Sequence, residues 1–339
     1  MYSAHLLPGP TSWYAVGFSE ELPPGGTLIR TLAGREILLF RTDSGVPAAV
    51  APHCPHLGAH IGHGGVVHGE TIRCPFHGAC FDVRGNCVKN GYGTTPHPNA
   101  VLTTWPMREL HGMLFVYLDG TGEQPAWEIP DIDTEGWTPV RHHAIHMRGH
   151  VQEIAENSCD IGHLRLLHGY QNVEMLSDLR TDGPYLNVRY RMTRPRRTFG
   201  RSQGSVVELE IHQYGLGYAR VEVLAVDLGV RTRHFVLAAP IDDDQVVLRL
   251  ALSVQRVHRP SMIHPLLALA PRTWTTGLVA TMGIKGFVAD VMQDVPIWTH
   301  KTFVATPALM KGDGPIGAYR KWTKQFYPDQ SGVGDPPTP

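Results

Sequence analysis

Two glycine-rich segments, each with one cysteine and one histidine at close spacing, constrain the fold of this chain more than any other feature. The segments are HCPHLGAHIGHGG and IRCPFHGACFD, and seventeen residues separate the Cys54-x-His56 pair from the Cys74-x-x-His77 pair. A [2Fe–2S] centre with two thiolates on one iron and two imidazoles on the other requires this set of ligands. We therefore predict that both segments are loops that meet at one cluster, with VVHGETIR as a hairpin between them.

The alternative for the same residues is a structural zinc site, which also takes cysteine and histidine ligands. Zinc sites usually combine a C-x-x-C pair with an H-x3–5-H pair, whereas each segment here mixes the two residue types. Glycines also favour the cluster, because they let the backbone approach inorganic sulfur closely; they are Gly58, Gly62, Gly64, Gly65 and Gly78. Colour separates the two hypotheses, since a cluster is brown and a zinc protein is colourless. We assign neither Cys80 nor Cys87 as a ligand.

The runs CPHLGA, GHGG and CPFHG resemble the Rieske domain of ring-hydroxylating and related oxygenases. High-potential Rieske proteins of respiratory complexes carry a further cysteine in each loop, where this chain has Ala59 and Phe76. They also carry a serine and a tyrosine that donate hydrogen bonds to the cluster, where this chain has Ala79 and Phe81. Fewer hydrogen bonds stabilise the reduced cluster less. The resemblance therefore implies a low-potential cluster that accepts electrons from a ferredoxin or flavin reductase.

The rest of the sequence predicts an α+β protein with a β-rich first domain over residues 1–125 and an α+β second domain over residues 126–328. Short strand-like runs between glycine and proline turns, such as TLIRTL, EILLFR and MLFVYL, fill the first part. A stretch rich in glycine, proline and acids, residues 119–137, is a plausible linker. Strand candidates over residues 185–257 precede a helical block over residues 273–303. We expect residues 329–339 to be a disordered tail.

Charge and hydropathy exclude several classes of protein. With 30 basic and 31 acidic side chains the formal net charge is -1, which gives no electrostatic case for binding nucleic acid or an anionic membrane surface. No apolar run reaches the ~20 residues of a transmembrane segment, and the first residues lack the pattern of a signal peptide. The odd count of 5 cysteines favours a reducing compartment. We expect a cytoplasmic location.

A second candidate metal site lies in EIAENSCDIGHLRLLHG, which the spacing of its apolar residues predicts to be a helix. Asp160 and His163 are three residues apart and would share one face. The five-residue separation of His163 and His168 predicts a break or a wide turn between them. Non-haem Fe(II) oxygenases bind iron with two histidines and one carboxylate and leave positions open for O2. A distant helical segment offers Asp290 and Asp294, four residues apart on one face, as the carboxylate.

The arrangement E-N-x-x-D-x-x-H-x-x-x-x-H closely resembles the catalytic signature of Rieske oxygenases. The resemblance implies that His163 and His168 bind the mononuclear iron. In that family the third ligand lies a few residues before a tryptophan, which selects Asp294, four residues before Trp298. Asp290 is the second candidate, and its alternative interpretation is a solvated helix charge.

The same resemblance implies a catalytic role for Asp160 as a bridge between two metal centres. In the family this carboxylate hydrogen-bonds a ligand histidine of its own chain and a cluster histidine of the neighbouring subunit. His56 or His77 of a second copy would be that partner here. The resemblance thus implies a homotrimer, in which the cluster of one subunit lies beside the iron of the next.

The resemblance covers nearly the whole chain, from WYAVGFSEELPPG to GPIGAYRKWTKQFYPD, and is strongest to the ketosteroid 9α-hydroxylases and the Neverland-type cholesterol 7-desaturases. It implies a helix-grip (START-like) catalytic domain with an antiparallel sheet and C-terminal helices. It also implies O2-dependent hydroxylation, desaturation or oxidative cyclisation of a bulky apolar, possibly steroid-like, substrate. The run GAC departs from the GW-x that these relatives usually have after the last cluster histidine.

Electrons from NAD(P)H would have to arrive through a separate reductase, because the chain shows no flavin or nicotinamide motif. GDGPIG matches G-x-G-x-x-G, but it neither follows a predicted strand nor opens the helix of a βαβ unit. A Rieske electron-transfer protein with a fused ligand-binding domain is the alternative function. That alternative predicts a cluster but no mononuclear iron.

Overall fold

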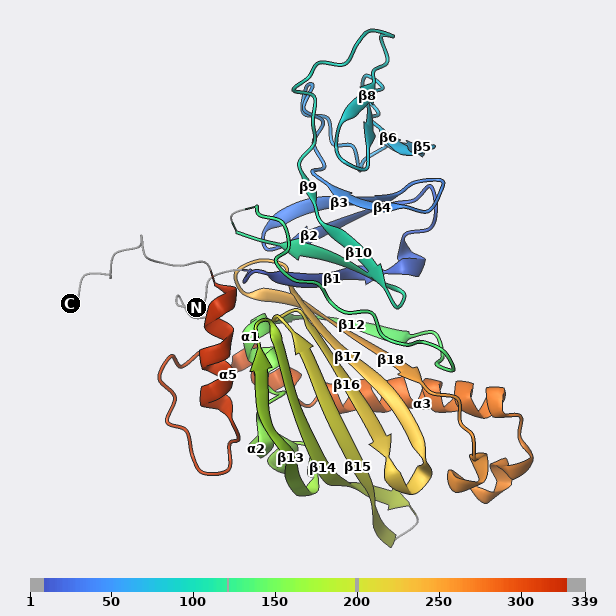
Figure 1. Cartoon of the computed structure of the whole chain (residues 1–339), viewed down its shortest axis with the longest axis vertical. Helices are drawn as coiled ribbons and strands as arrows, with labels where there is room; N and C mark the ends of the chain where they lie inside the picture. The colour runs from blue at the N-terminus through green and yellow to red at the C-terminus, as the bar shows by residue number, and fades with distance from the viewer. Residues whose placement is uncertain (1–8, 121, 199–200, 328–339) are drawn as a thin grey trace, which may run out of the picture.

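The computed structural model describes residues 9–120, 122–198 and 201–327. These residues form four antiparallel sheets and a few helices, which confirms the predicted α+β class. The sheets follow one another along the longest axis of the molecule, with the smallest hairpins at one end and the largest sheet at the other (Figure 1). The predicted tail, residues 329–339, lies outside the described residues.

Three small sheets make up the first part of the chain, and the strands predicted there are present. The outermost sheet has the order β5 (Val66–His68), β6 (Thr71–Arg73), β7 (Cys80–Asp82), β8 (Cys87–Lys89). The next has the order β2 (Thr27–Leu32), β3 (Arg35–Arg41), β4 (Pro47–Val50), β9 (Thr104–Trp105). The third has the order β1 (Ser12–Phe18), β11 (Met113–Leu118), β10 (Met107–Leu110).

The second part of the chain is built on a 7-stranded sheet whose order is β12-β18-β17-β16-β15-β14-β13. Its strands are β12 (Arg141–Arg148), β13 (Gln171–Asp182), β14 (Tyr185–Thr198), β15 (Arg201–Tyr214), β16 (Tyr218–Ala225), β17 (Val230–Pro240) and β18 (Gln245–Val254). Every neighbouring pair is antiparallel. The strands predicted over residues 185–257 are present as β14 to β18, whereas β13 was not predicted.

Helices cover one face and one end of this sheet. They are α3 (Arg272–Val291), α4 (Val295–His300) and α5 (Ile316–Thr323). The 3₁₀ turns are η1 (Ser19–Glu21) after β1, and η2 (Val226–Leu228), η3 (Pro260–Met262), η4 (Pro265–Leu269) and η5 (Lys324–Phe326) in the second part of the chain. Helix α3 packs on β18, where Ala280 joins a buried cluster with Leu252 and Val254. Among the described helices, none combines the length and the apolar character needed to cross a membrane.

The helix predicted around the second metal site is two short helices, α1 (Val151–Glu156) and α2 (Ile161–Leu166). The helix is interrupted before Asp160, the N-cap of α2. Its backbone is extended (φ -88°, ψ 99°), and its side chain accepts a hydrogen bond from the His163 N–H. The N–H of Ile161 donates to the carbonyl of Asp313 at 3.0 Å. A distant loop thus supplies a hydrogen-bond acceptor for the first N–H group of α2. The spacing of apolar residues alone could not predict this interruption.

Buried contacts fix the first part of the chain against the large sheet. Trp13 of β1 packs in one cluster with Tyr218 and Phe235 of the large sheet. The guanidinium of Arg249 donates to the carbonyls of Ala15 and Val16 at 2.8 and 3.0 Å. Burial lowers the pKa of Arg249 to about 10, so the side chain stays charged at neutral pH. The domain limit between residues 125 and 126 stays a prediction.

Candidate metal centres and substrate cavity

The two predicted cluster loops have the same backbone turn. The N–H of Cys54 donates to the carbonyl of Ala59 at 2.8 Å, and the N–H of Cys74 donates to that of Ala79 at 2.7 Å. The hairpin of β5 and β6 joins the loops, as VVHGETIR predicted. Each turn contains a glycine in the left-handed region, with φ 75° and 69°, where a side chain would be strained.

The loops place two thiols inside the domain and two imidazoles at its surface. Cys54 and Cys74 are 3% and 2% exposed, whereas His56 is exposed and His77 partly so. The imidazole rings of His56 and His77 have centroids 4.8 Å apart. Burial raises the pKa of the Cys54 thiol to about 11, so a thiolate there depends on a bound cation. The donor set fits a [2Fe–2S] cluster, which the two buried thiols and the two imidazoles at the surface would hold.

The three predicted iron ligands lie close together in the second domain. The candidate ligand atoms of His163, His168 and Asp294 all lie within 4.8 Å of one another. His168 Nε2 is 3.3 Å from Asp294 Oδ2, and these side chains are 8% and 7% exposed. The predicted turn is present, because α2 ends at Leu166 and His168 lies just beyond it. Two imidazoles and a carboxylate in such a cluster are the donor set of a non-haem Fe(II) site.

Neighbouring groups orient these donors. The Nδ1–H of His163 donates to the carbonyl of Asp160 at 2.5 Å, which leaves Nε2 as the atom with a free lone pair. Burial lowers the pKa of His163, which favours the neutral, metal-binding form. The amide of Asn157 donates to Asp294 Oδ1 at 3.1 Å and holds that carboxylate in place. The residues therefore fit a mononuclear iron.

The resemblance implies a hydrogen bond from the Asp160 carboxylate to the ring of a ligand histidine in its own chain. Here the carboxylate bonds the backbone of His163 and not its ring. Asp160 Oδ1 accepts the His163 N–H at 3.0 Å and lies 3.9 Å from His163 Nδ1, so the ring is bound by the backbone carbonyl instead. The Asp160 side chain is 34% exposed. The carboxylate is therefore accessible to a group from another chain.

The two candidate aspartates lie in different environments. Asp290 is in α3, whereas Asp294 is the N-cap of α4, because α3 ends at Val291. They therefore do not share the face of one continuous helix. Asp290 pairs with Arg194 at 2.5 Å and accepts a hydrogen bond from the Tyr170 hydroxyl at 3.3 Å. Asp290 is thus an ion-paired and partly exposed charge at the cavity wall, and it does not belong to the cluster of His163, His168 and Asp294.

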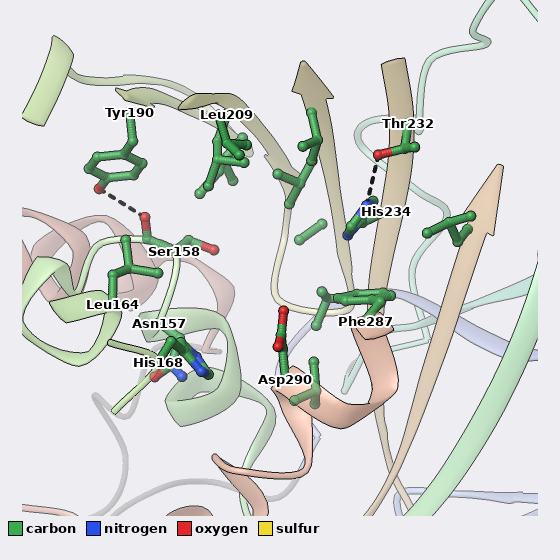
Figure 2. A pocket seen from close by; sticks show the side chains of 18 of the residues that line it. Asn157, Ser158, Leu164, His168, Tyr190, Leu209, Thr232, His234, Phe287 and Asp290 are labelled. Carbon is green, nitrogen blue, oxygen red and sulfur yellow. Dashed lines mark hydrogen bonds between the residues drawn. The ribbon is translucent and has the colours of Figure 1, made fainter. Parts of the chain in front are cut away.

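A cavity of about 620 Å³ extends from these residues across the inner face of the large sheet. Apolar side chains line most of it, among them Met192, Leu209, Val221, Val223, Val236, Phe287 and Leu252. Figure 2 shows His168 on one side of this space and His234 with Thr232 on strands across it, with Phe287 and Asp290 on α3 between them. Such a space fits a large apolar molecule.

Polar groups in the cavity wall beyond the candidate iron ligands and Asp290 were not predicted from the sequence. Among the described residues, the buried Oε1 of Gln213 and hydroxyl of Tyr218 have no hydrogen-bond partner. His234 Nε2 lies 2.9 Å from the Thr232 hydroxyl, and burial lowers the pKa of His234 to about 3. A signal was present: in SVVELEIHQY the alternate positions read Ser, Val, Leu, Ile, Gln, so Gln213 interrupts an apolar face.

Family models match most of the chain. Residues 12–106 match the model of the Rieske [2Fe-2S] domain. Residues 116–327 match the model of the 3-ketosteroid 9alpha-hydroxylase C-terminal domain, which is more than half of the chain.

Similar proteins and structures agree with these matches. Cholesterol 7-desaturase nvd 1 of Ciona intestinalis is 29% identical over 95% of this chain and 69% of its own length. The oxygenase component of 3-ketosteroid-9-alpha-monooxygenase from Rhodococcus rhodochrous is 27% identical over 95% of this chain and 83% of its own. Pseudomonas putida CBB5 NdmA with caffeine has a TM-score of 0.66 at 18% identity, covering 92% of this chain and 89% of that one. Dicamba monooxygenase bound to dicamba has a TM-score of 0.64 at 17% identity, covering 94% and 97%.

Proposed function

Because the chain belongs to the 3-ketosteroid 9α-hydroxylase family of Rieske oxygenases, we propose that it oxidises a bulky, polycyclic, steroid-like substrate in the 620 Å³ cavity. It is an oxidoreductase that uses O2, a [2Fe–2S] cluster and a mononuclear iron, with electrons from a separate NAD(P)H-dependent reductase. The observation that carries the substrate proposal is that the two-histidine, one-carboxylate cluster forms part of the wall of a largely apolar cavity.

We assign the metal centres to the residues that lie together. Cys54, His56, Cys74 and His77 would bind the [2Fe–2S] cluster. His163, His168 and Asp294 would bind the mononuclear iron, and they fit it because one imidazole is already bound through Nδ1 and the carboxylate is already held by an amide. When bound, these groups supply single electrons and a site for O2 activation.

The cavity residues would position the substrate and exclude water. The apolar strands of the sheet and Phe287 enclose it, which favours a rigid hydrocarbon skeleton over a polar metabolite. Gln213 and Tyr218 offer buried hydrogen-bonding atoms that have no partner within the described part of the chain, and these suit an oxygen function on that skeleton. The named relatives act on cholesterol and a 3-ketosteroid, which supports this class.

Asp160 would link one subunit to the next. Its accessible carboxylate lies at the start of the helix that carries His163, and His56 or His77 of a second copy would hydrogen-bond to it. We propose a homotrimer on this basis, with a ferredoxin or flavin reductase as the electron donor.

Counting iron tests the assignment. We expect wild-type protein to hold about three irons per chain, and Asp294→Ala to lose about one while keeping the cluster. Asp290→Asn is the matched control, because Asp290 lies four residues earlier and pairs with Arg194, and it should keep the full iron content. Iron analysis and the electron paramagnetic resonance signal of the reduced cluster provide the measurements.

Turnover separates this function from simple electron transfer. Reduced wild-type protein given O2 and a steroid panel should yield a product that has gained an oxygen atom or lost two hydrogens. A chain with about two irons, equal in wild type and Asp294→Ala, would instead support the electron-transfer alternative. A mononuclear iron with no turnover of any polycyclic compound would reject the substrate class.

A further inference from the structure

Exposed apolar side chains gather on the segment that leads into α3 and on that helix as far as Met282. Met262, Leu266, Leu269, Trp274 and Met282 are 40%, 83%, 97%, 56% and 65% exposed. We call these five residues the 262–282 patch. Turn η4 is a 3₁₀ helix, so Leu266 and Leu269, three residues apart, project on the same side. In Figure 1 this orange segment forms the outer end of α3, away from the first domain.

The charges around the patch are all of one sign along the chain. Exposed cations on this segment are Arg256, Arg259, Arg272 and Lys285. No aspartate or glutamate occurs from residue 245 to residue 289. Asp227 lies on the nearby turn η2, and its carboxylate accepts the N–H of Val206 at 2.8 Å. The chain segment that carries the patch is therefore basic, although the formal net charge of the whole chain is -1.

The patch is continuous with the substrate cavity. Ile263 and Val279 line the cavity and lie within the patch segment. Met282 both lines the cavity and is 65% exposed, so the cavity reaches the surface beside it. A molecule that leaves or enters by this route would pass over the exposed apolar side chains.

We propose that the 262–282 patch is a peripheral membrane-binding surface that inserts its apolar side chains into an anionic phospholipid bilayer. Leucine, methionine and tryptophan flanked by arginine and lysine are the composition that binds at the bilayer interface. Docking there sets the cavity opening against the lipid, so that an apolar substrate enters without crossing water. This last step rests on the proposed function, whereas the binding itself does not.

Charge favours a bilayer over a second copy bound through the same patch as the occupant. A symmetric contact between two such patches would bring the same four cations toward each other. An anionic lipid surface complements them.

Co-sedimentation of the intact, cluster-containing protein with vesicles tests the proposal. Wild type should bind vesicles of phosphatidylcholine with phosphatidylglycerol, bind pure phosphatidylcholine more weakly, and lose affinity as salt rises. Leu266→Asp with Leu269→Asp, and separately Arg259→Glu with Arg272→Glu, should each weaken binding about tenfold or more. Val46→Asp is the matched control, since Val46 is 47% exposed in the first domain, and it should bind like wild type.

Several results would overturn the proposal. One is wild type that does not sediment with either vesicle. Another is equal binding by Leu266→Asp/Leu269→Asp when cluster absorbance and melting temperature match those of wild type. A third is a change in the solution mass of that variant with vesicle binding unchanged, because the patch would then be a protein interface.

The way substrate is presented separates failure of this inference from failure of the proposed function. The patch variants should lose turnover of a steroid held in vesicles and keep turnover of the same steroid delivered in cyclodextrin. Turnover from cyclodextrin by a protein that does not bind vesicles would reject only the membrane surface. Vesicle binding without turnover of any polycyclic compound would reject only the substrate class.

Discussion

At the scale of single residues, burial favours the neutral form of two histidines in the cavity wall, His163 and His234. Burial lowers the pKa of His163, and this favours metal binding over protonation. It also lowers the pKa of His234, to about 3, because that ring packs into the cavity wall against Phe287. The folded protein therefore depends on keeping these two rings unprotonated, although the Asp290–Arg194 ion pair places charge elsewhere in the cavity wall.

This dependence predicts a loss of stability in acid. The pKa of His234 is the ordinary 6.5 in the unfolded chain and about 3 in the folded protein, so between these values the unfolded state binds a proton that the folded state does not. The free energy of unfolding should then fall as pH drops below 6.5, by about 1.4 kcal/mol per pH unit for this one group. His234→Gln keeps a hydrogen-bonding side chain beside Thr232 and removes the titration. Urea unfolding between pH 6.5 and pH 4.5 should show a shallower decline for the variant.

Part of the decline should persist in His234→Gln, because burial also lowers the pKa of His212, to about 4. The exposed His258→Gln variant measures the general effect of losing a histidine. If His234→Gln and His258→Gln change the slope equally, burial of His234 does not control acid stability.

At the scale of helices and strands, the sequence predicted elements whose signals are local and failed where distant contacts decide. The cluster loops could be predicted because cysteine, histidine and glycine spacing is local. Strand β13 was missed because three irregularities in its register with β14 interrupt the alternation of apolar residues. The helix break before Asp160 depends on a hydrogen bond from Ile161 to the carbonyl of Asp313, more than a hundred residues away. The family resemblance selected Asp294 over Asp290, but the spacing of apolar residues could not show that α3 ends at Val291, between the two.

The start of α2 gives a prediction that separates the structural and functional roles of Asp160. As the N-cap it should stabilise the helix, so Asp160→Ala should cost about 1 kcal/mol of unfolding free energy. Asp160→Asn should retain most of that stability, because asparagine is an equally good N-cap. Both variants should keep the cluster and the mononuclear iron and lose turnover, since each lacks the carboxylate. Urea unfolding, iron content and single-turnover product yield are the measurements.

The comparison of the two variants decides the interpretation. Full activity in Asp160→Ala would exclude a bridging role. Turnover restored by asparagine would show that the N-cap alone matters.

At the scale of the whole molecule, the two metal centres lie in different parts of one chain. The cluster loops are at the end of the longest axis that carries β5 to β8, whereas His163 and Asp294 belong to the part that carries the large sheet (Figure 1). The β1-β11-β10 sheet lies between, packed against the large sheet by Trp13 and Arg249. Neither part can swing toward the other without breaking these buried contacts. Electron delivery from a second subunit avoids that cost.

Mixed oligomers test this arrangement directly. His77→Ala chains should lack the cluster, and His163→Ala chains should lack the mononuclear iron, so each is inactive alone. Co-expressed in equal amounts, they should recover about one quarter of the wild-type rate per chain, because half the chains keep iron and half of their neighbours keep a cluster. Delivery within one chain predicts no recovery.

A second mixture provides the control. Wild type co-expressed with chains carrying both substitutions should fall to about one quarter of the wild-type rate if electrons cross between subunits, and to about one half if they do not. Electron transfer between subunits therefore predicts the higher rate in the first mixture and the lower rate in the second. No recovery in the first and one half in the second would reject the homotrimer as the unit of catalysis and leave Asp160 with only its role as a helix cap.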